Sequence, residues 1–303
     1  MLIQSISGIR GTIGGPAGQG LTPKDIVRFG MGYAAWVKEQ AAGARPLVVV
    51  GRDARLSGQM LRDVLAGTLQ AMGVDVLDLG LSTTPTVELA VPAEGAHGGI
   101  ILTASHNPRQ WNALKLLDAR GEFLNATEGE RVLAFAAQEL EAVEVDDLGQ
   151  IRHDDHWLQR HIDHALGLEL VDAPAVRARG LKVAVDAVNS TGGLILPMLL
   201  ESMGVDVVRV HCDPTGDFAH NPEPLPAHLT DLAEAVVSHG CDLGISVDPD
   251  VDRLAFVCED GSMFGEEYTL VAVADYVLSR TPGNTVSNMS STRALRQVTE
   301  ARG

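Results

Sequence analysis

The sequence is poor in the residues that build disulfide-stabilised or membrane-spanning proteins. Among 303 residues only Cys212, Cys241 and Cys258 are cysteines, and none forms a C-x-x-C pair. This excludes a disulfide framework and indicates reduced thiols. No apolar run reaches the roughly 18 residues that span a bilayer, and the first fifteen residues lack the apolar segment of a signal peptide. We expect a soluble, cytoplasmic protein without a membrane partner.

Positive charge is also scarce. Lysine and arginine number 23 against 40 acidic residues, which gives a formal net charge of −17. This balance disfavours nucleic acid and anionic membranes as partners, so an anionic ligand would need a local island of arginine, lysine, metal and backbone N–H groups. Aromatic residues make up 4% and hydrophobic residues 45%, which is typical of an α/β core of Val, Leu, Ile and Ala. The length favours two domains and part of a third.

Apolar residues recur in a pattern of alternating strands and helices. Strands are predicted at 46–53, 74–80, 98–104, 181–188, 205–212 and 241–250, and helices at 57–73, 86–91, 156–166, 192–204 and 229–240. This order predicts an α/β protein with successive parallel or mixed sheets sandwiched by helices. A polar, acidic stretch at 139–155 separates the two halves and favours a domain boundary.

A short polar loop, Ser105-His106-Asn107-Pro108, follows the predicted strand at 98–104. In open α/β sheets the ligand crevice lies outside the carboxyl ends of the strands. Pro108 prevents simple continuation of the strand and restricts Asn107 to extended backbone, so Ser105 is presented on a stiff loop. The alternative is an ordinary turn, because Ser, Asn and Pro are common turn residues. No G-x-S-x-G occurs, which excludes a hydrolase elbow.

Three aspartates alternate in the loop ISVDPDVDRLAFV (245–257). Extended backbone would turn the carboxylates of Asp248, Asp250 and Asp252 the same way. Three like charges held together favour a cation, and hard oxygen ligands suit Mg²⁺. A solvated acidic turn is the alternative. A calcium loop of the EF-hand type is rejected, because Arg253 occupies the position that needs glycine.

Two segments are both basic and rich in glycine: SGIRGTIGG (7–15), with Arg10, and VGRDARLSG (50–58), with Arg52 and Arg55. Arginine binds phosphate through its planar fork, and glycines let backbone N–H groups approach an anion. No Walker A sequence occurs. Each arginine alone is typical of a surface or salt-bridge residue, and Arg10 is the best phosphate-binding candidate.

Together these motifs resemble the α-D-phosphohexomutase family, which interconverts hexose 1- and 6-phosphates. The main evidence is T-A-S-H-N-P (103–108), with Trp111-Asn112 and Lys115 after it, and the D-x-D-x-D-R loop (248–253). Further matching segments follow the family's order: S-G-I-R-G-T (7–12), G-R-D-x-R (51–55), D-A-V-N-S-T-G-G (186–193) and N-P-E-P-L-P (221–226).

The resemblance implies a division of the chain into three parts and a shared metal and phosphate site. Residues 1–150 would form domain I with the phosphoserine loop, residues 151–255 domain II with the metal loop, and residues 256–303 part of domain III. Ser105 would carry a phosphoryl group as phosphoserine. One Mg²⁺ would be bound by an oxygen of that group together with the carboxylates of Asp248, Asp250 and Asp252.

The resemblance also implies roles for the neighbouring side chains. Lys115 and Arg10 would lie at the transferring group, and Lys115 would lower the proton affinity of the sugar hydroxyl or accept its proton if burial and Arg10 depress its pKa. His106 would assist or order the loop. Arg253 would contact the phosphoserine or order the aspartates, and Asn107 would help to bind phosphate.

The implied partner is a hexose phosphate, and the stretch NPRQWNALKLLDARGEFL (107–124) is most similar to phosphoglucosamine mutases. Phosphomannomutase and phosphoglucomutase are the alternatives. A hypothesis of another class is a non-catalytic remnant that only binds metal or sugar phosphate. Gly303 is expected to be a truncation point before the family's sugar-reading loops. The oligomeric state stays open.

Overall fold

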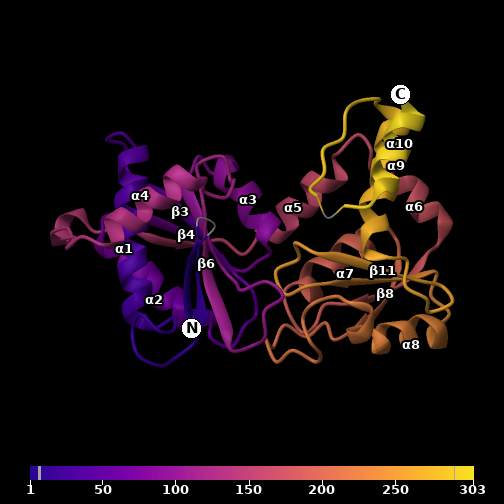
Figure 1. Ribbon diagram of the computed structural model, residues 1–303, viewed down its shortest axis with the longest axis horizontal. Helices are drawn as coiled ribbons and strands as arrows, with labels where there is room; N and C mark the ends of the chain where they lie inside the picture. The colour runs from indigo at the N-terminus through magenta and orange to yellow at the C-terminus, as the bar shows by residue number, and fades with distance from the viewer. Residues whose placement is uncertain (6–7, 290) are drawn as a thin grey trace.

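The computed structural model describes residues 1–5, 8–289 and 291–303, so Ser7 of the S-G-I-R-G-T segment lies outside the described residues. Two α/β units lie side by side along the long axis, and the C-terminal helices lie at the top of the second unit (Figure 1). Among the described residues no helix combines the length and the apolar character that crossing a bilayer requires.

The first sheet has the strand order β1-β2-β6-β5-β3-β4-β7. Its strands are β1 (Leu2–Ser5), β2 (Gly8–Thr12), β3 (Leu47–Arg52), β4 (Asp75–Leu81), β5 (Gly98–Leu102), β6 (Trp111–Leu117) and β7 (Ile151–His153). The predicted parallel pairing holds for β3 with β4 and β5. β6 runs antiparallel to β5, because the eight-residue connection 103–110 is too short for a crossover helix. The sheet is therefore mixed, as the fold class allowed.

Helices cover both faces of this sheet. They are α1 (Pro23–Gln40), α2 (Gly58–Ala71), α3 (Thr84–Ala93), α4 (Ala126–Ala136) and α5 (Trp157–Leu166). The alternation of β3 decides the faces: Val48 and Val50 pack with α1, α2 and α4, whereas Val49 packs with α3 and Trp157. A strand buried on both sides explains the uninterrupted apolar run LVVV at its start.

The second sheet has the order β11-β10-β8-β9. Its elements are β8 (Lys182–Asp186), β9 (Asp206–Val210), β10 (Leu243–Val247) and β11 (Leu254–Cys258), with α6 (Ala173–Arg179), α7 (Gly192–Ser202), α8 (Thr230–His239) and the 3₁₀ turn η2 (Pro226–His228). The other 3₁₀ turn, η1 (Val145–Asp147), precedes β7 in the first unit. β7 pairs with β4, so residues 151–153 join the first sheet, and β11 takes Phe256 into the second. The predicted boundaries at 151 and 256 fall inside or beside these strands.

The topology brings two pairs of loops together. In the first sheet the chain leaves β3 for β4 on one side and then returns to β5 on the other, and in the second sheet β8 likewise lies between β9 and β10. In open α/β sheets such a switch point leaves a crevice at the carboxyl ends of the strands. The loops after β3 and β5 therefore lie together, as do the loops after β8 and β10.

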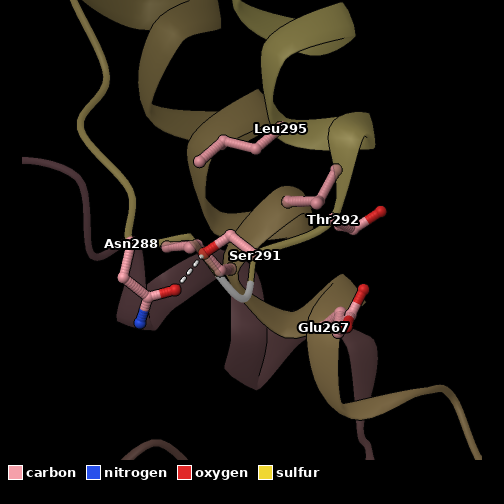
Figure 2. Close-up of a pocket in the computed structure, with 7 residues that line it drawn as sticks. Glu267, Asn288, Ser291, Thr292 and Leu295 are labelled. Carbon is pink, nitrogen blue, oxygen red and sulfur yellow. Dashed lines mark hydrogen bonds between the residues drawn. The ribbon is translucent and has the colours of Figure 1, made fainter.

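The C-terminal helices α9 (Glu266–Arg280) and α10 (Arg293–Arg302) pack on each other. A cavity of about 360 Å³ lies between them, and none of the predicted site residues lines it (Figure 2). Its lining residues are Glu267, Leu270, Val271, Asn288, Ser291, Thr292 and Leu295. The outer face of α9 leaves Tyr268 and Val273 more than half exposed, at 51% and 55%. Little apolar burial therefore holds this segment to the second sheet.

We predict that residues 266–303 exchange their amide hydrogens before β8 and β10 do. Local opening is easiest where few apolar contacts are buried, and α9 and α10 bury fewer than the central strands. Hydrogen-exchange mass spectrometry at peptide resolution measures the order. Equal protection of α9 and β10 would contradict this account of the C-terminal segment.

Candidate functional site

Ser105 lies directly after β5 in a strained conformation. Its φ of 49° places a non-glycine residue in the left-handed region, which a fixed surrounding must stabilise. Its backbone N–H donates to Thr103 Oγ1 at 2.9 Å, and its hydroxyl donates to Asp248 Oδ2 at 2.7 Å. The residue is only 6% exposed. This loop is therefore not a solvated turn, because its hydroxyl points across to the second unit.

A single buried arginine fixes the loop that carries Ser105. The guanidinium of Arg55 donates to four backbone carbonyls, those of Ser105, Asn107, Pro108 and Trp111. Its Nε donates to Asp53 Oδ2 at 3.0 Å in an ion pair whose side chains are fully buried. The sequence offered Arg55 either as a phosphate ligand or as a salt-bridge residue. The structure uses its whole donor fork inside the protein.

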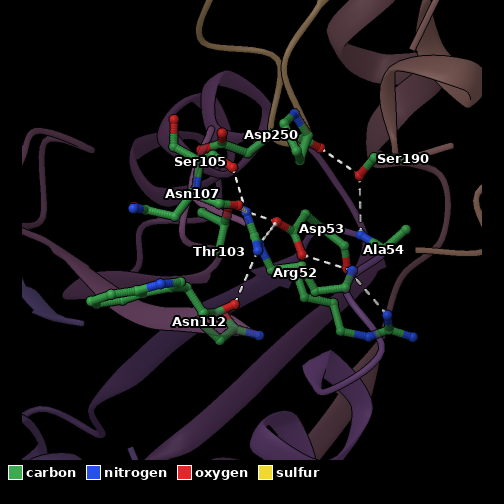
Figure 3. Close-up of polar contacts among 12 residues, drawn as sticks. Arg52, Asp53, Ala54, Thr103, Ser105, Asn107, Asn112, Ser190 and Asp250 are labelled. Atoms are coloured by element: carbon green, nitrogen blue, oxygen red, sulfur yellow. Dashed lines mark hydrogen bonds and ion pairs between the residues drawn. The ribbon is translucent and has the colours of Figure 1, made fainter. Parts of the chain in front are cut away.

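Asp53 completes this support from the end of β3. Its carboxylate accepts the hydroxyl of Thr103 at 2.7 Å as well as the Arg55 guanidinium, and Figure 3 shows this network beneath Ser105. Burial raises the pKa of Asp53, although Arg55 and Thr103 act in the opposite direction. Asp53 thus holds the Thr103 hydroxyl, and that hydroxyl holds the backbone of Ser105. These hydrogen bonds fix the loop of Ser105 to the end of β3.

The three predicted aspartates meet at the end of β10. Oxygen atoms of Asp248, Asp250 and Asp252 all lie within 4.8 Å of one another. The expected extended backbone is wrong, because the loop is a turn. Asp248 O accepts the N–H of Val251 at 3.1 Å, and Val251 has a φ of 64°. Tight turning, and not strand alternation, gathers the carboxylates.

The environment of Asp248 disfavours its charge. Burial raises its pKa well above the ordinary value, and the carboxylates of Asp250 and Asp252 raise it further. The hydrogen bond from Ser105 lowers the pKa but is outweighed. Its Oδ1 accepts the backbone N–H groups of Asp252 and Arg253, both at 3.1 Å, which fixes the carboxylate in the loop.

Lys115 joins the two units at the other side of the aspartates. Its Nζ donates to Asp250 Oδ2 at 2.6 Å and to Asp252 Oδ2 at 2.9 Å. Burial lowers the pKa of Lys115, but the two carboxylates outweigh burial and raise it. For Asp250, burial raises the pKa, but the charge of Lys115 and the hydrogen bonds outweigh burial, and the pKa is lowered overall. The expected depression of the Lys115 pKa is therefore wrong for this arrangement.

The aspartate cluster fits a hard divalent cation. Asp250 Oδ1 is buried and has no hydrogen-bond partner among the described residues. Such an orphaned oxygen is costly unless something positive faces it. Three carboxylates with converging oxygens are also the donor set that Mg²⁺ or a similar ion accepts. The residues present thus support a metal site, with Asp248, Asp250 and Asp252 as the protein ligands.

The remaining candidates of the first unit surround Ser105. Arg10 Nη1 donates to Asn107 Oδ1 at 2.9 Å, which ties β2 to the loop. His106 Nδ1 lies 3.3 Å from Ser105 Oγ. Burial lowers the pKa of His106, and nearby Arg253 adds to this effect. Arg10 therefore contacts the loop that presents the serine hydroxyl, and His106 and Asn107 belong to that loop.

Arg253 approaches from the second unit. Its backbone contacts Asp248, and its Nη1 donates to Glu223 Oε1 at 3.1 Å in a half-exposed ion pair. Glu223 belongs to the N-P-E-P-L-P segment, so this segment lies beside the aspartate loop. The guanidinium thus stands at the rim of the site, close enough to His106 to affect its pKa.

Sequence reasoning missed the residues that hold the aspartate loop. Ser190 Oγ donates to Pro249 O at 2.7 Å and accepts the N–H of Ala54 at 3.3 Å, so it links both units (Figure 3). Thr191 Oγ1 donates to Pro249 O at 2.9 Å, and Thr84 Oγ1 donates to Asp250 Oδ2 at 2.5 Å. The quoted D-A-V-N-S-T-G-G and G-R-D-x-R segments contained part of this signal, but no pattern indicated which partners they contact.

Comparison with known protein families gives two matches that together cover most of the chain. Residues 2–142 match the phosphoglucomutase/phosphomannomutase alpha/beta/alpha domain I, and residues 159–261 match domain II of the same family. A phosphoglucomutase/phosphomannomutase of Thermococcus kodakarensis is 36% identical over 97% of this chain. A probable phosphoglucosamine mutase of Methanopyrus kandleri is 32% identical over 98% of it. The chain spans 64% and 63% of the length of these relatives.

Solved structures agree with this match. A phosphoglucomutase/phosphomannomutase family protein from Burkholderia thailandensis has a TM-score of 0.81 and 28% identity, with 100% of this chain and 65% of that chain covered. A putative phosphomannomutase from Thermus thermophilus has a TM-score of 0.86 and 27% identity, with coverage of 99% and 67%. Two mixed sheets flanked by helices are thus an architecture that these proteins share with the chain.

We predict that Asp248→Asn stabilises the metal-free protein at neutral pH by on the order of 1 kcal/mol, the scale of a typical point change. The raised pKa of Asp248 means that ionising it opposes folding. This group's contribution to stability is full below its unfolded pKa and is lost as pH rises through its folded pKa. The wild type should therefore lose stability relative to the variant from about pH 4 upwards.

Urea unfolding in EDTA between pH 4.5 and 7.5 measures the difference. Asp252→Asn is the matched control, because it removes the same charge at a side chain that is 33% exposed and should change stability less. If the variant is less stable than the wild type at pH 7, or if the difference in stability does not grow with pH, then ionisation of Asp248 does not destabilise the folded protein.

Proposed function

The chain belongs to the phosphoglucomutase/phosphomannomutase family, and on that premise we propose that it is the phosphoserine- and metal-binding part of a phosphohexomutase. The observation that carries the proposal is the contact of Ser105 Oγ with Asp248 Oδ2 at 2.7 Å, within a buried carboxylate cluster. This hydrogen bond places the serine hydroxyl of the first unit against the candidate cation site of the second unit. Neither feature alone would indicate phosphoryl transfer.

Phosphorylation of Ser105 explains why a cation belongs here. The present hydrogen bond needs the serine proton, and a phosphoryl ester on Oγ has none. The ester would bring negative charge against the buried Asp248 carboxylate, which already resists ionisation. A bound Mg²⁺ would supply Lewis-acid polarisation of the phosphoryl oxygens. Asp248, Asp250 and Asp252 are the residues that would hold it.

The transfer balances in two steps. In the first, a free sugar hydroxyl attacks phosphorus, the Ser105 Oγ–P bond breaks, and the hydroxyl proton passes to the departing Ser105 Oγ. The product is a hexose bisphosphate, and Ser105 regains a proton. In the second, Ser105 Oγ attacks the other phosphate of the reoriented bisphosphate and restores the ester. The bond between that phosphorus and its sugar oxygen breaks, the sugar oxygen takes the serine proton, and a hexose monophosphate is released. Such transfer depends mainly on positioning and charge stabilisation.

Three cationic side chains would stabilise the negative charge of the phosphoryl group. Lys115 stays protonated between Asp250 and Asp252, so its role is to stabilise developing negative charge and not to accept a proton in this state. Arg10 reaches the loop through Asn107, and Arg253 faces it from the second unit. These groups form the local positive island that an anionic ligand needs on a protein of net charge −17.

Glucosamine phosphate is the favoured hexose phosphate within this proposal, and mannose or glucose phosphate is the alternative. The stretch NPRQWNALKLLDARGEFL supports the first. A relative named phosphoglucomutase/phosphomannomutase and one named probable phosphoglucosamine mutase have similar sequence identities to the chain. A non-catalytic remnant that only binds metal or sugar phosphate is the second candidate. The carboxylate cluster by itself would be enough for metal binding. The chemical state of Ser105 separates the two.

We predict that incubation with Mg²⁺ and glucose 1,6-bisphosphate adds about 80 Da, one phosphoryl group, to the wild-type chain. Ser105→Ala should gain nothing, because the Ser105 hydroxyl is the one that contacts Asp248, whereas the hydroxyl of Thr84 is held at the start of α3 against Asp250. Intact-mass analysis followed by peptide mapping measures both. Ser57→Ala is the control, since this hydroxyl lies on the adjacent loop and accepts a hydrogen bond from Asn112. Equal mass gain in the Ser105→Ala variant would overturn the assignment of the carrier.

We predict that Asp250→Asn weakens Mg²⁺ binding at least about tenfold, because it removes one charge and one hard ligand from the cluster. Isothermal titration calorimetry on the wild type and the variant measures the affinity. Glu223→Gln removes a neighbouring carboxylate outside the cluster and should bind Mg²⁺ as the wild type does. Unchanged affinity in Asp250→Asn would assign the aspartates to a purely structural turn.

A further inference from the structure

We infer that Thr84 is a positioning residue for the divalent-cation site and holds Asp250 from the opposite α/β unit. The inference rests on the proposed metal site but concerns a residue that no motif or predicted ligand set included. Thr84 begins α3 in the first unit, whereas Asp250 lies in the loop after β10 in the second. A ligand of one unit is therefore held by a helix end of the other.

Thr84 makes two separate contacts with Asp250. Its hydroxyl donates to Asp250 Oδ2 at 2.5 Å, and its backbone N–H donates to Asp250 O at 2.9 Å. Both residues are almost completely buried, with exposures of 2% and 0%. One contact fixes the main chain of the ligand residue and the other fixes one carboxylate oxygen, so neither rotation nor displacement of Asp250 is free.

The donor end is itself rigid. Thr83 caps α3 by accepting the backbone N–H of Thr86 at 3.1 Å, and its hydroxyl is also 2.7 Å from that of Thr86. Pro85 follows at the start of the helix, where its fixed φ suits the first turn. Thr84 is β-branched, so its side chain has few rotamers. The hydroxyl position is thereby set by the helix and not by the aspartate.

The two carboxylate oxygens of Asp250 have different surroundings. Oδ2 is occupied by Thr84 and Lys115, whereas Oδ1 is buried without a partner among the described residues. Lys115 has a flexible stem and can follow a moving carboxylate, but Thr84 cannot. Thr84 therefore leaves Oδ1 as the oxygen of Asp250 that a cation can bind. Partners of this kind orient metal ligands, and their loss typically weakens metal affinity about 10- to 100-fold.

The test measures Mn²⁺ binding by the loss of the free-ion signal in electron paramagnetic resonance, with Mg²⁺ as competitor. Thr84→Val keeps the side-chain shape without the hydroxyl and should weaken Mn²⁺ binding about tenfold. Thr84→Ser restores the hydroxyl and should bind within about twofold of the wild type. Thr68→Val is the matched control, because its hydroxyl donates to the backbone of Val64 within α2 and contacts no aspartate of the cluster.

Each outcome decides a different claim. If the wild type does not bind Mn²⁺, the proposed metal site fails. If the wild type binds but Thr84→Val binds within twofold of it, or if Thr68→Val weakens binding equally, the positioning role of Thr84 is overturned. Urea unfolding in EDTA checks the fold of each variant first. If Thr84→Val does not fold, Thr84→Ala is compared with Thr84→Ser, and equal affinities overturn the inference.

Discussion

Mutual repulsion among the buried carboxylates is the constraint on which the rest of the site depends. Asp248 and Asp250 are completely buried within one short turn, and Asp252 is close to both. Such a cluster is stable only where donors and cations surround it. The first unit supplies Ser105, Lys115 and Thr84 to the cluster as donors. The association of the two units therefore follows from the charge that the second unit alone would leave unsatisfied.

The strained serine loop depends on a second buried charge pair. A left-handed residue persists only where its surroundings fix it, and Arg55 fixes this loop through four carbonyls at once. Arg55 in turn is neutralised by Asp53. Removing either partner would leave the other charge buried without compensation. The geometry at Ser105 thus depends on Asp53, which directly follows β3.

Much of the fold followed from periodicity, because strands and helices bury apolar residues at different spacings. The predicted strand at 46–53 is β3 (Leu47–Arg52), and the helix at 229–240 is α8 (Thr230–His239). The strand β7 was missed, since Ile151–His153 is short and mostly polar at the edge of the sheet. Its pairing with β4 is a long-range contact that no local pattern encodes. The positive island was expected, but the difference between Arg10, which contacts Asn107, and Arg55, which is buried, was not.

The sequence by itself determined which residue types stand at the strand ends: a serine shortly before a proline after β5, and alternating aspartates after β10. It also determined the α/β alternation that puts these loops at carboxyl strand ends. Only the tertiary structure decided that a turn gathers the aspartates, that their charge raises the pKa of Lys115, and that Thr84 holds Asp250. The reason is physical: hydrogen bonds and pKa values depend on distances and burial across two units, and neither is encoded in the spacing of residues along one chain.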